Sequence, residues 1–148
     1  MTPPIRILCV DDDVPQLTII SMVLKKEGYI VETAKDGNEG LKKARDWKPD
    51  LIIMDVMMPG LDGFQATKRL KADPDTAHIG VLMLTAKGGV DENVKEAYKM
   101  ATRVQDRLKG FDSGALEFLT KPVKAKDLVQ RVKAVLWATG IGFTPRDD

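Results

Sequence analysis

Short apolar runs and segments of helical periodicity alternate along this chain. The runs with strand character lie at residues 5–10, 30–31, 51–54, 81–84 and 116–119. Between them, apolar residues recur at spacings of three and four, as in Leu17, Ile20 and Leu24, which is the pattern of a helix with one buried face. This alternation, repeated five times, predicts a parallel sheet with helices on both faces.

Residues with capping side chains indicate where the helices begin. Asp13, Asp36 and Asp127 each precede a periodic segment, and we expect each of them to begin a helix. Another helix is expected to start near Asp62, after a turn rich in proline and glycine. Gly28 is expected to end the first helix.

The segment between Thr85 and Lys121 departs from this simple alternation. Seven apolar residues recur there at alternate spacings of four and three: Val90, Val94, Ala97, Ala101, Val104, Leu108 and Phe111. Such spacing over about three repeats predicts a long helix with a narrow apolar stripe. The stripe can fold back on its own domain or contact a partner, and the sequence leaves both interpretations open.

Composition narrows the classes of function. A chain of 148 residues suits one domain, and its net charge of +1 gives no general attraction to nucleic acid or to an anionic membrane. No apolar run approaches the ~20 residues that a membrane span requires. The single cysteine, Cys9, lies inside an apolar run, so no disulfide framework is expected. These features predict a soluble, cytoplasmic protein.

Polar side chains follow four of the predicted strands. Asp11 and Asp12 come after the first, Asp55 ends the third, Thr85 ends the fourth, and Lys121 follows the last. Because parallel strands deliver their carboxyl ends to one edge of a sheet, we expect these groups to meet there. Asp55 can act there as a helix cap or as a nucleophile, and an acidic residue at a buried edge is costly without a partner or a metal.

Together with the turn at Pro59 and Gly60 and the pair Lys121-Pro122, these residues resemble the receiver domain of two-component response regulators over roughly residues 5–138. The resemblance implies a flavodoxin-like, doubly wound five-stranded parallel sheet. An excess of about 14 residues, in an insertion at about 88–109, would lengthen the fourth helix by ~20 Å if it were all helical. We therefore divide the chain into a receiver domain, residues 1–138, and a polar tail, residues 139–148.

The resemblance also implies how the phosphoryl chemistry is divided among residues. Asp55 would accept a phosphoryl group from a sensor histidine kinase or a histidine phosphotransfer protein. Mg²⁺ would be held directly by Asp12, Asp55 and the backbone carbonyl of Met57, and through water by Asp11. This acidic set suits Mg²⁺ because a hard cation binds a few carboxylate ligands and keeps several of its waters. Asp13 is interpreted as the helix cap instead of a ligand.

Three further residues receive roles from the same resemblance. Lys121 would pair with Asp55 at rest and with a phosphoryl oxygen after transfer, and its bond to Pro122 would be cis. Thr85 would donate its hydroxyl to the phosphoryl group and act with Phe118, the aromatic residue of the conformational switch. The fourth helix, with the last strand and helix, would form the face for a homodimer or a downstream protein.

Two other classes of protein remain as rivals. A haloacid-dehalogenase-like phosphatase also uses an aspartate nucleophile and Mg²⁺, but it needs a second aspartate where this chain has Met57. An interaction module that works without phosphorylation would not need Thr85, Lys121 or the acidic pair, and all of them are present. We therefore expect a signalling domain that acts on itself, with no separate substrate and no direct contact with nucleic acid.

Overall fold

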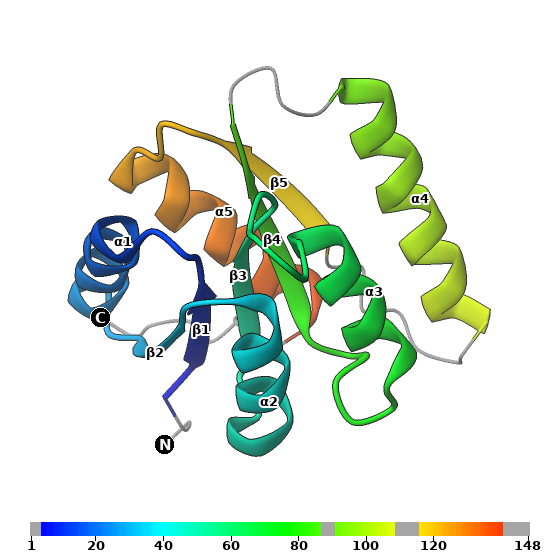
Figure 1. Ribbon diagram of the computed structural model, residues 1–148, viewed down its shortest axis with the longest axis horizontal. Helices are drawn as coiled ribbons and strands as arrows, with labels where there is room; N and C mark the ends of the chain where they lie inside the picture. Colours follow the sequence, from blue (N-terminus) through cyan, green and yellow to red (C-terminus); the bar gives the residue numbers. More distant parts are fainter. Residues whose placement is uncertain (1–3, 87–90, 109–115, 141–148) are drawn as a thin grey trace.

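The structure, a computed structural model, describes residues 4–86, 91–108 and 116–140, and for residues 102–108 only the backbone is considered. Strands and helices alternate along the chain (Figure 1). In order they are β1 (Arg6–Val10), α1 (Val14–Lys26), β2 (Ile30–Ala34), α2 (Gly37–Trp47), β3 (Leu51–Asp55), α3 (Gly63–Ala72), β4 (Gly80–Thr85), α4 (Glu92–Leu108), β5 (Leu116–Thr120) and α5 (Ala125–Ala138).

The five strands form one parallel sheet in the order β2-β1-β3-β4-β5. This arrangement confirms the predicted flavodoxin-like fold. β3 lies in the middle, and all five of its residues are buried, as expected for a strand covered on both faces. Asp55 lies opposite Leu84 in the register, and Thr85 lies opposite Thr120, so the polar strand ends share one edge.

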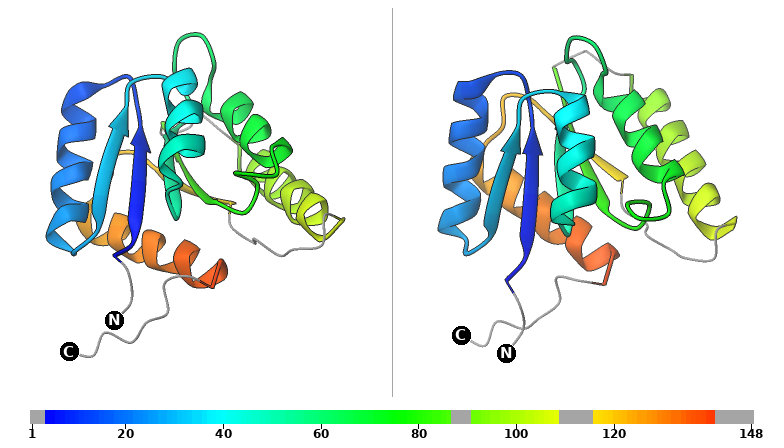
Figure 2. Two further views of the ribbon diagram at one scale, coloured as in Figure 1. Left: turned by 90° about the horizontal axis from the view of Figure 1, so that it is seen from below. Right: turned by 60° about the horizontal axis from the view of Figure 1, so that its bottom comes forward.

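Two apolar layers hold the helices on the sheet. α1 and α5 cover one face, and α2 and α3 cover the other, with α4 beside α3 (Figures 1 and 2). The first layer includes Leu17 and Leu24 from α1 with Leu128 and Val132 from α5. The second layer includes residues of α2 and α3 and reaches Phe118 on β5.

Side-chain caps confirm most of the predicted helix starts. Asp13 accepts a hydrogen bond from the Gln16 amide at the start of α1, and Asp36 caps α2 in the same way. Asp62 forms a capping box at the start of α3. The prediction for Asp127 is wrong: α5 begins two residues earlier, so this carboxylate lies in its first turn, where it still suits the helix dipole.

The orientation of α4 bears on the two interpretations of its apolar stripe for the residues whose side chains are described. Val94 is 52 % exposed, and Ala97 and Ala101 are exposed as well. For these three residues the stripe does not fold back on the domain, because the helix turns Lys95, Tyr98 and Lys99 inward instead. Val90 and Phe111 lie outside the described residues, as do the side chains of Val104 and Leu108.

No helix among the described residues combines the length and the apolar character needed to cross a membrane.

Candidate functional site

Three carboxylates converge at the carboxyl edge of the sheet. One oxygen from each of Asp11, Asp12 and Asp55 can be chosen so that the three lie within 4.8 Å of one another. Asp55 arrives on β3, and the other two follow directly after β1, which pairs with β3. The predicted meeting of these residues is thus confirmed, and it follows from the register of two neighbouring parallel strands.

Lys121 supplies the positive charge of the cluster. Its Nζ lies 2.8 Å from a carboxylate oxygen of Asp55 and 3.7 Å from one of Asp11. Its backbone amide donates to the Thr85 carbonyl at 2.7 Å, which ties the residue after β5 to the end of β4. The bond from Lys121 to Pro122 is cis, as the resemblance implied.

Burial makes negative charge costly at this edge. Loss of solvent raises the pKa of Asp11 to about 6, because the bond from the Asp13 amide and the charge of Lys121 offset only part of that loss. Burial also raises the pKa of Asp55, against the lowering effect of Lys121. Burial alone would lower the pKa of Lys121, but its bond to Asp55 and the nearby carboxylates raise it above the ordinary value.

The carboxylate cluster fits a hard divalent cation. Asp11 Oδ2 is buried and has no hydrogen-bond partner, whereas its Oδ1 accepts from the Asp13 amide at 3.0 Å. An orphaned carboxylate oxygen beside two further carboxylates is the donor set that Mg²⁺ prefers. Asp13 itself caps α1, in agreement with the division of the acidic triplet made from the sequence.

Thr85 offers an unused hydroxyl at the same edge. The residue is buried, and its Oγ1 has no hydrogen-bond partner. A buried hydroxyl without a partner costs free energy, and an acceptor placed beside it would remove that cost. Ala86, which follows it, is small and exposed, so it adds little bulk at the end of β4.

Phe118 is buried against the face of the sheet that carries α3. Its ring centroid lies 6.2 Å from that of Phe64. The predicted switch residue is therefore packed inward in this structure, two register positions away from the Thr85–Thr120 pair.

The turn after β3 brings two further features to the site. The side chain of Met57 is 73 % exposed, and only its backbone carbonyl was predicted as a ligand. Gly63 packs closely on the strand end, since a Cβ there would lie 2.4 Å from the Asp55 carbonyl oxygen. A larger residue at this position would displace either α3 or the strand that delivers Asp55.

Sequence reasoning missed one residue near the site. Lys95 of α4 lies 3.5 Å from the Thr120 hydroxyl and 5.9 Å from the Phe118 ring centroid. Lys95 lies outside the apolar stripe of the heptad pattern, so the pattern gave it no contact with the domain. A helical wheel could not find this contact, because the periodicity does not say which face of α4 meets β5.

Comparison with known proteins agrees with this geometry. Residues 7–103 match the family model described as the response regulator receiver domain. The chain is 42 % identical over 134 residues to the DNA-binding dual master transcriptional regulator RpaA of Synechocystis. That match covers 90 % of this chain but only 50 % of RpaA. It is 38 % identical to protein PilH of Pseudomonas aeruginosa, with 88 % of this chain and 97 % of PilH covered.

A solved structure shows the same fold. A response regulator from Chloroflexus aurantiacus superposes with a TM-score of 0.75 at 36 % identity, covering 91 % of this chain and 99 % of that one. Among the sequence relatives, this chain spans about half the length of RpaA and nearly all of PilH.

Proposed function

Since the chain belongs to the response regulator receiver family, we propose that Asp55 accepts a phosphoryl group from a phosphohistidine on a sensor kinase or a histidine phosphotransfer protein. The observation that carries the proposal is the convergence of Asp11, Asp12 and Lys121 on Asp55 at the end of the central strand. A nucleophile flanked by a cation and by a metal-binding carboxylate pair suits phosphoryl transfer, which depends on positioning and electrostatics.

The transfer breaks one bond to phosphorus and forms another. A carboxylate oxygen of Asp55 attacks the phosphorus atom, and the P–N bond of the phosphohistidine breaks. The imidazole nitrogen keeps the bonding electron pair and takes up a proton, while Asp55 becomes an acyl phosphate. Lys121, 2.8 Å from Asp55, then pairs with a phosphoryl oxygen, and the free hydroxyl of Thr85 donates to another.

We propose that the cation is Mg²⁺. Asp11, Asp12 and Asp55 would hold it, with the backbone carbonyl of Met57 as a further protein ligand. When bound, Mg²⁺ neutralises the negative charge that carboxylates and phosphoryl oxygens would otherwise place together. The fit rests on Asp11 Oδ2, which is buried and accepts no hydrogen bond, with the Lys121 ammonium 3.7 Å away.

The response is a change of packing, and the chemistry stays within the protein. The acyl phosphate is later hydrolysed, so the chain acts on itself and is not an enzyme for a separate substrate. Phe118 changes position together with Thr85 when the phosphoryl group is present. We place this activity in the cytoplasm, in a receiver domain of residues 1–138 followed by a polar tail of residues 139–148.

The exposed stripe of α4 supports a second proposal, contact with a second copy of this chain. Val94, Ala97 and Ala101 lie on one side of the helix and face away from the sheet. Heptad spacing favours pairing of one helix with an equivalent helix, since the two stripes match each other. The face formed by α4, β5 and α5 would then join two copies, or one copy to a downstream protein.

The test of the proposed function uses a small phosphodonor. The full chain is incubated with acetyl phosphate and Mg²⁺, and labelling is followed by intact mass. Wild type should gain one phosphoryl group that survives acid and is released by hydroxylamine, as expected of an acyl phosphate. Asp55→Asn should gain none, whereas Asp75→Asn, at an exposed loop position, should label as wild type does. Labelling of Asp55→Asn at the wild-type rate would show that the assignment is wrong.

A further inference from the structure

The described part of α4 turns its polar side toward the domain. Lys95 is buried, Tyr98 and Lys99 are half-buried, and Val94 and Ala97 are exposed. A surface helix usually buries its apolar side. The attachment of α4 to the sheet therefore depends on polar contacts to an unusual degree.

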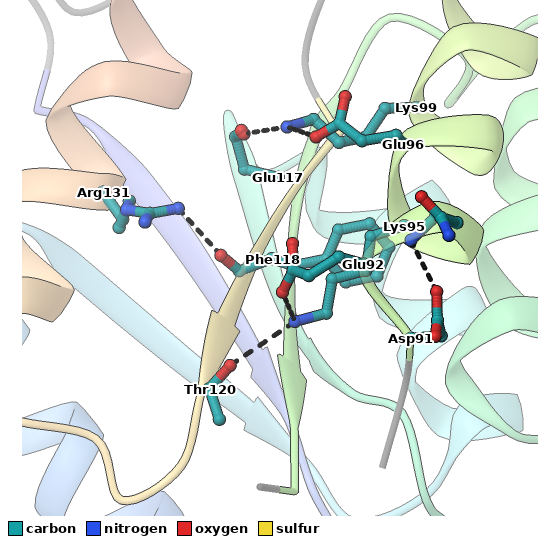
Figure 3. Close-up of polar contacts among 10 residues, drawn as sticks. Asp91, Glu92, Lys95, Glu96, Lys99, Glu117, Phe118, Thr120 and Arg131 are labelled. Atoms are coloured by element: carbon teal, nitrogen blue, oxygen red, sulfur yellow. Dashed lines mark hydrogen bonds and ion pairs between the residues drawn. The ribbon is translucent and has the colours of Figure 1, made fainter. Parts of the chain in front are cut away.

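Lys99 makes the clearest of these contacts. Its Nζ lies 2.9 Å from a carboxylate oxygen of Glu117 on β5 and 3.6 Å from one of Glu96 on its own helix (Figure 3). Both Lys99 and Glu117 are half-buried, so water and salt screen the pair less than they would on an open surface. The pair joins α4 to the edge strand of the sheet.

Lys95 makes the second contact, one turn earlier. The residue is 8 % exposed, and its Nζ lies 3.0 Å from Glu92 and 3.5 Å from the Thr120 hydroxyl, above the ring of Phe118 (Figure 3). Glu92 is 81 % exposed at its side chain, so it is a weak counterion. A buried ammonium needs partners, and β5 supplies the remaining ones.

Apolar support for α4 is limited in the described residues. The ring of Tyr98 packs edge-to-face on Phe64 at 4.9 Å, and its hydroxyl donates to the Phe64 carbonyl at 3.2 Å. The inner faces of α1 and α5 instead bury leucine and isoleucine or valine side chains. Because buried ion pairs gain little beyond their desolvation cost, we expect the described part of α4, residues 91–101, to open more readily than α1 or α5.

The Lys95 contact lies beside the proposed phosphorylation site, whereas the Lys99 pair lies nearer the start of β5. Thr120, which Lys95 touches, precedes Lys121 and lies opposite Thr85 in the register of the sheet. Lys121 binds Asp55, and Thr85 has a free buried hydroxyl. On the other side of β5, Arg131 of α5 donates to the Phe118 carbonyl at 2.8 Å (Figure 3). β5 is therefore bound to α5 by a short hydrogen bond and to α4 by the longer contact of Lys95 with Thr120.

We propose that Lys95 and Lys99 form an electrostatic latch that docks α4 on β5, and that phosphorylation of Asp55 opens this latch through Thr120. The second half of the proposal rests on the proposed function, since it needs the acyl phosphate. A phosphoryl group draws Lys121 and the Thr85 hydroxyl to new acceptors, and the residues between them and Lys95 shift with them. The latch predicts that α4 docking depends on charge complementarity.

A charge exchange tests the latch itself. Hydrogen exchange of the full chain is measured by mass spectrometry, with α1 as the internal reference. Lys99→Glu alone and Glu117→Lys alone should each speed exchange of α4 amides about fivefold. The double variant restores opposite charges across the contact, so its exchange should return to within about twofold of wild type. Lys68→Met, at an exposed position on α3, is the matched control and should change nothing.

Two outcomes would overturn the latch. If the single variants leave α4 exchange unchanged, the ion pair does not hold the helix. If the double variant exchanges as fast as the singles, the contact is only steric. Neither measurement requires phosphorylation, so this arm stands or falls independently of the proposed function.

A second arm tests the coupling to Asp55. After labelling with acetyl phosphate and Mg²⁺, wild-type α4 should exchange about fivefold faster than unlabelled α4. Lys95→Met keeps the length of the side chain but removes its charge, so its α4 should exchange fast before labelling and gain little afterwards. Labelled wild type with unchanged α4 exchange would refute the coupling. A chain that takes no label at all would instead refute the proposed function.

Discussion

Replacing Asp11 by asparagine should stabilise the protein when no divalent cation is present. The Asp11 carboxylate is buried beside two other carboxylates, and one of its oxygens has no hydrogen-bond partner. Asparagine keeps the oxygen that accepts from the Asp13 amide and removes the negative charge. The new amide can donate to a neighbouring carboxylate, which turns a repulsive contact into a hydrogen bond.

The magnitude follows from the pKa of Asp11, which burial raises from 3.8 to about 6. A raised carboxyl pKa means that the folded state holds its proton more tightly than the unfolded state, so stability falls as the pH rises from about 4 to about 6. Above that window the full cost applies, and a shift of about two units corresponds to about 3 kcal/mol. The substitution also removes the attraction between Asp11 and Lys121, 3.7 Å apart, which offsets part of this stabilisation. We therefore expect the free energy of unfolding to rise by about 1–3 kcal/mol at pH 7.

Urea unfolding with a chelator at pH 4, 5, 6 and 7 measures this effect. Wild type should lose stability across the window relative to Asp11→Asn, and the two should converge near pH 4. Addition of Mg²⁺ should reverse the order at pH 7, because the cation stabilises only the protein that binds it well. Asp75→Asn, in an exposed loop, should follow wild type throughout. A metal-free Asp11→Asn variant that is less stable than wild type at pH 7 would refute the reasoning.

Three further predictions follow from the structure. Asp12→Ala should abolish Mg²⁺ binding measured by calorimetry, whereas Asp13→Ala should still bind Mg²⁺ and lose about 1 kcal/mol of stability because α1 loses its cap. Equal loss of Mg²⁺ affinity in both variants would contradict the assignment of Asp12 as a ligand and Asp13 as a cap. Met57→Asn should speed decay of the acyl phosphate, since an amide can orient an attacking water at this exposed position and a thioether cannot; an unchanged or slower decay would contradict it. Val94→Glu with Ala101→Glu should disrupt self-association seen by light scattering while Asp55 still labels, and a wild type that stays monomeric in both states would exclude a homodimer.

The meeting of the polar groups at the carboxyl edge could be predicted because the register of a parallel sheet leaves little freedom. Once 51–54 and 5–10 are recognised as neighbouring strands, Asp55 and Asp11 must emerge at the same edge. Lys121 and Thr85 follow from the same rule applied to β4 and β5. What the sequence could not give is the state of each group, such as the orphaned oxygen of Asp11, because burial depends on how the loops close over the edge.

The orientation of α4 lay beyond the sequence for a related reason. Its heptad pattern identifies a helix and a stripe, but the inward face is chosen by what the sheet offers. β5 presents Glu117 and Thr120 there, and these partners suit Lys99 and Lys95 better than they suit alanine or valine. The rule that apolar residues face inward therefore failed where the neighbouring strand offered an acidic side chain and a hydroxyl.

The polar docking of the described part of α4 is the reason why we expect this helix, and not α1 or α5, to report the state of Asp55. A phosphoryl group adds negative charge next to Lys121 and supplies an acceptor to the Thr85 hydroxyl, which is a local change of limited free energy. A ligand shifts an equilibrium only by its difference in affinity for the two states. Helices held by buried leucine and valine side chains would absorb such a difference without moving. Docking of the described part of α4 through Lys95 and Lys99 on β5 would leave a smaller gap between its docked and undocked states, so we expect this helix to respond.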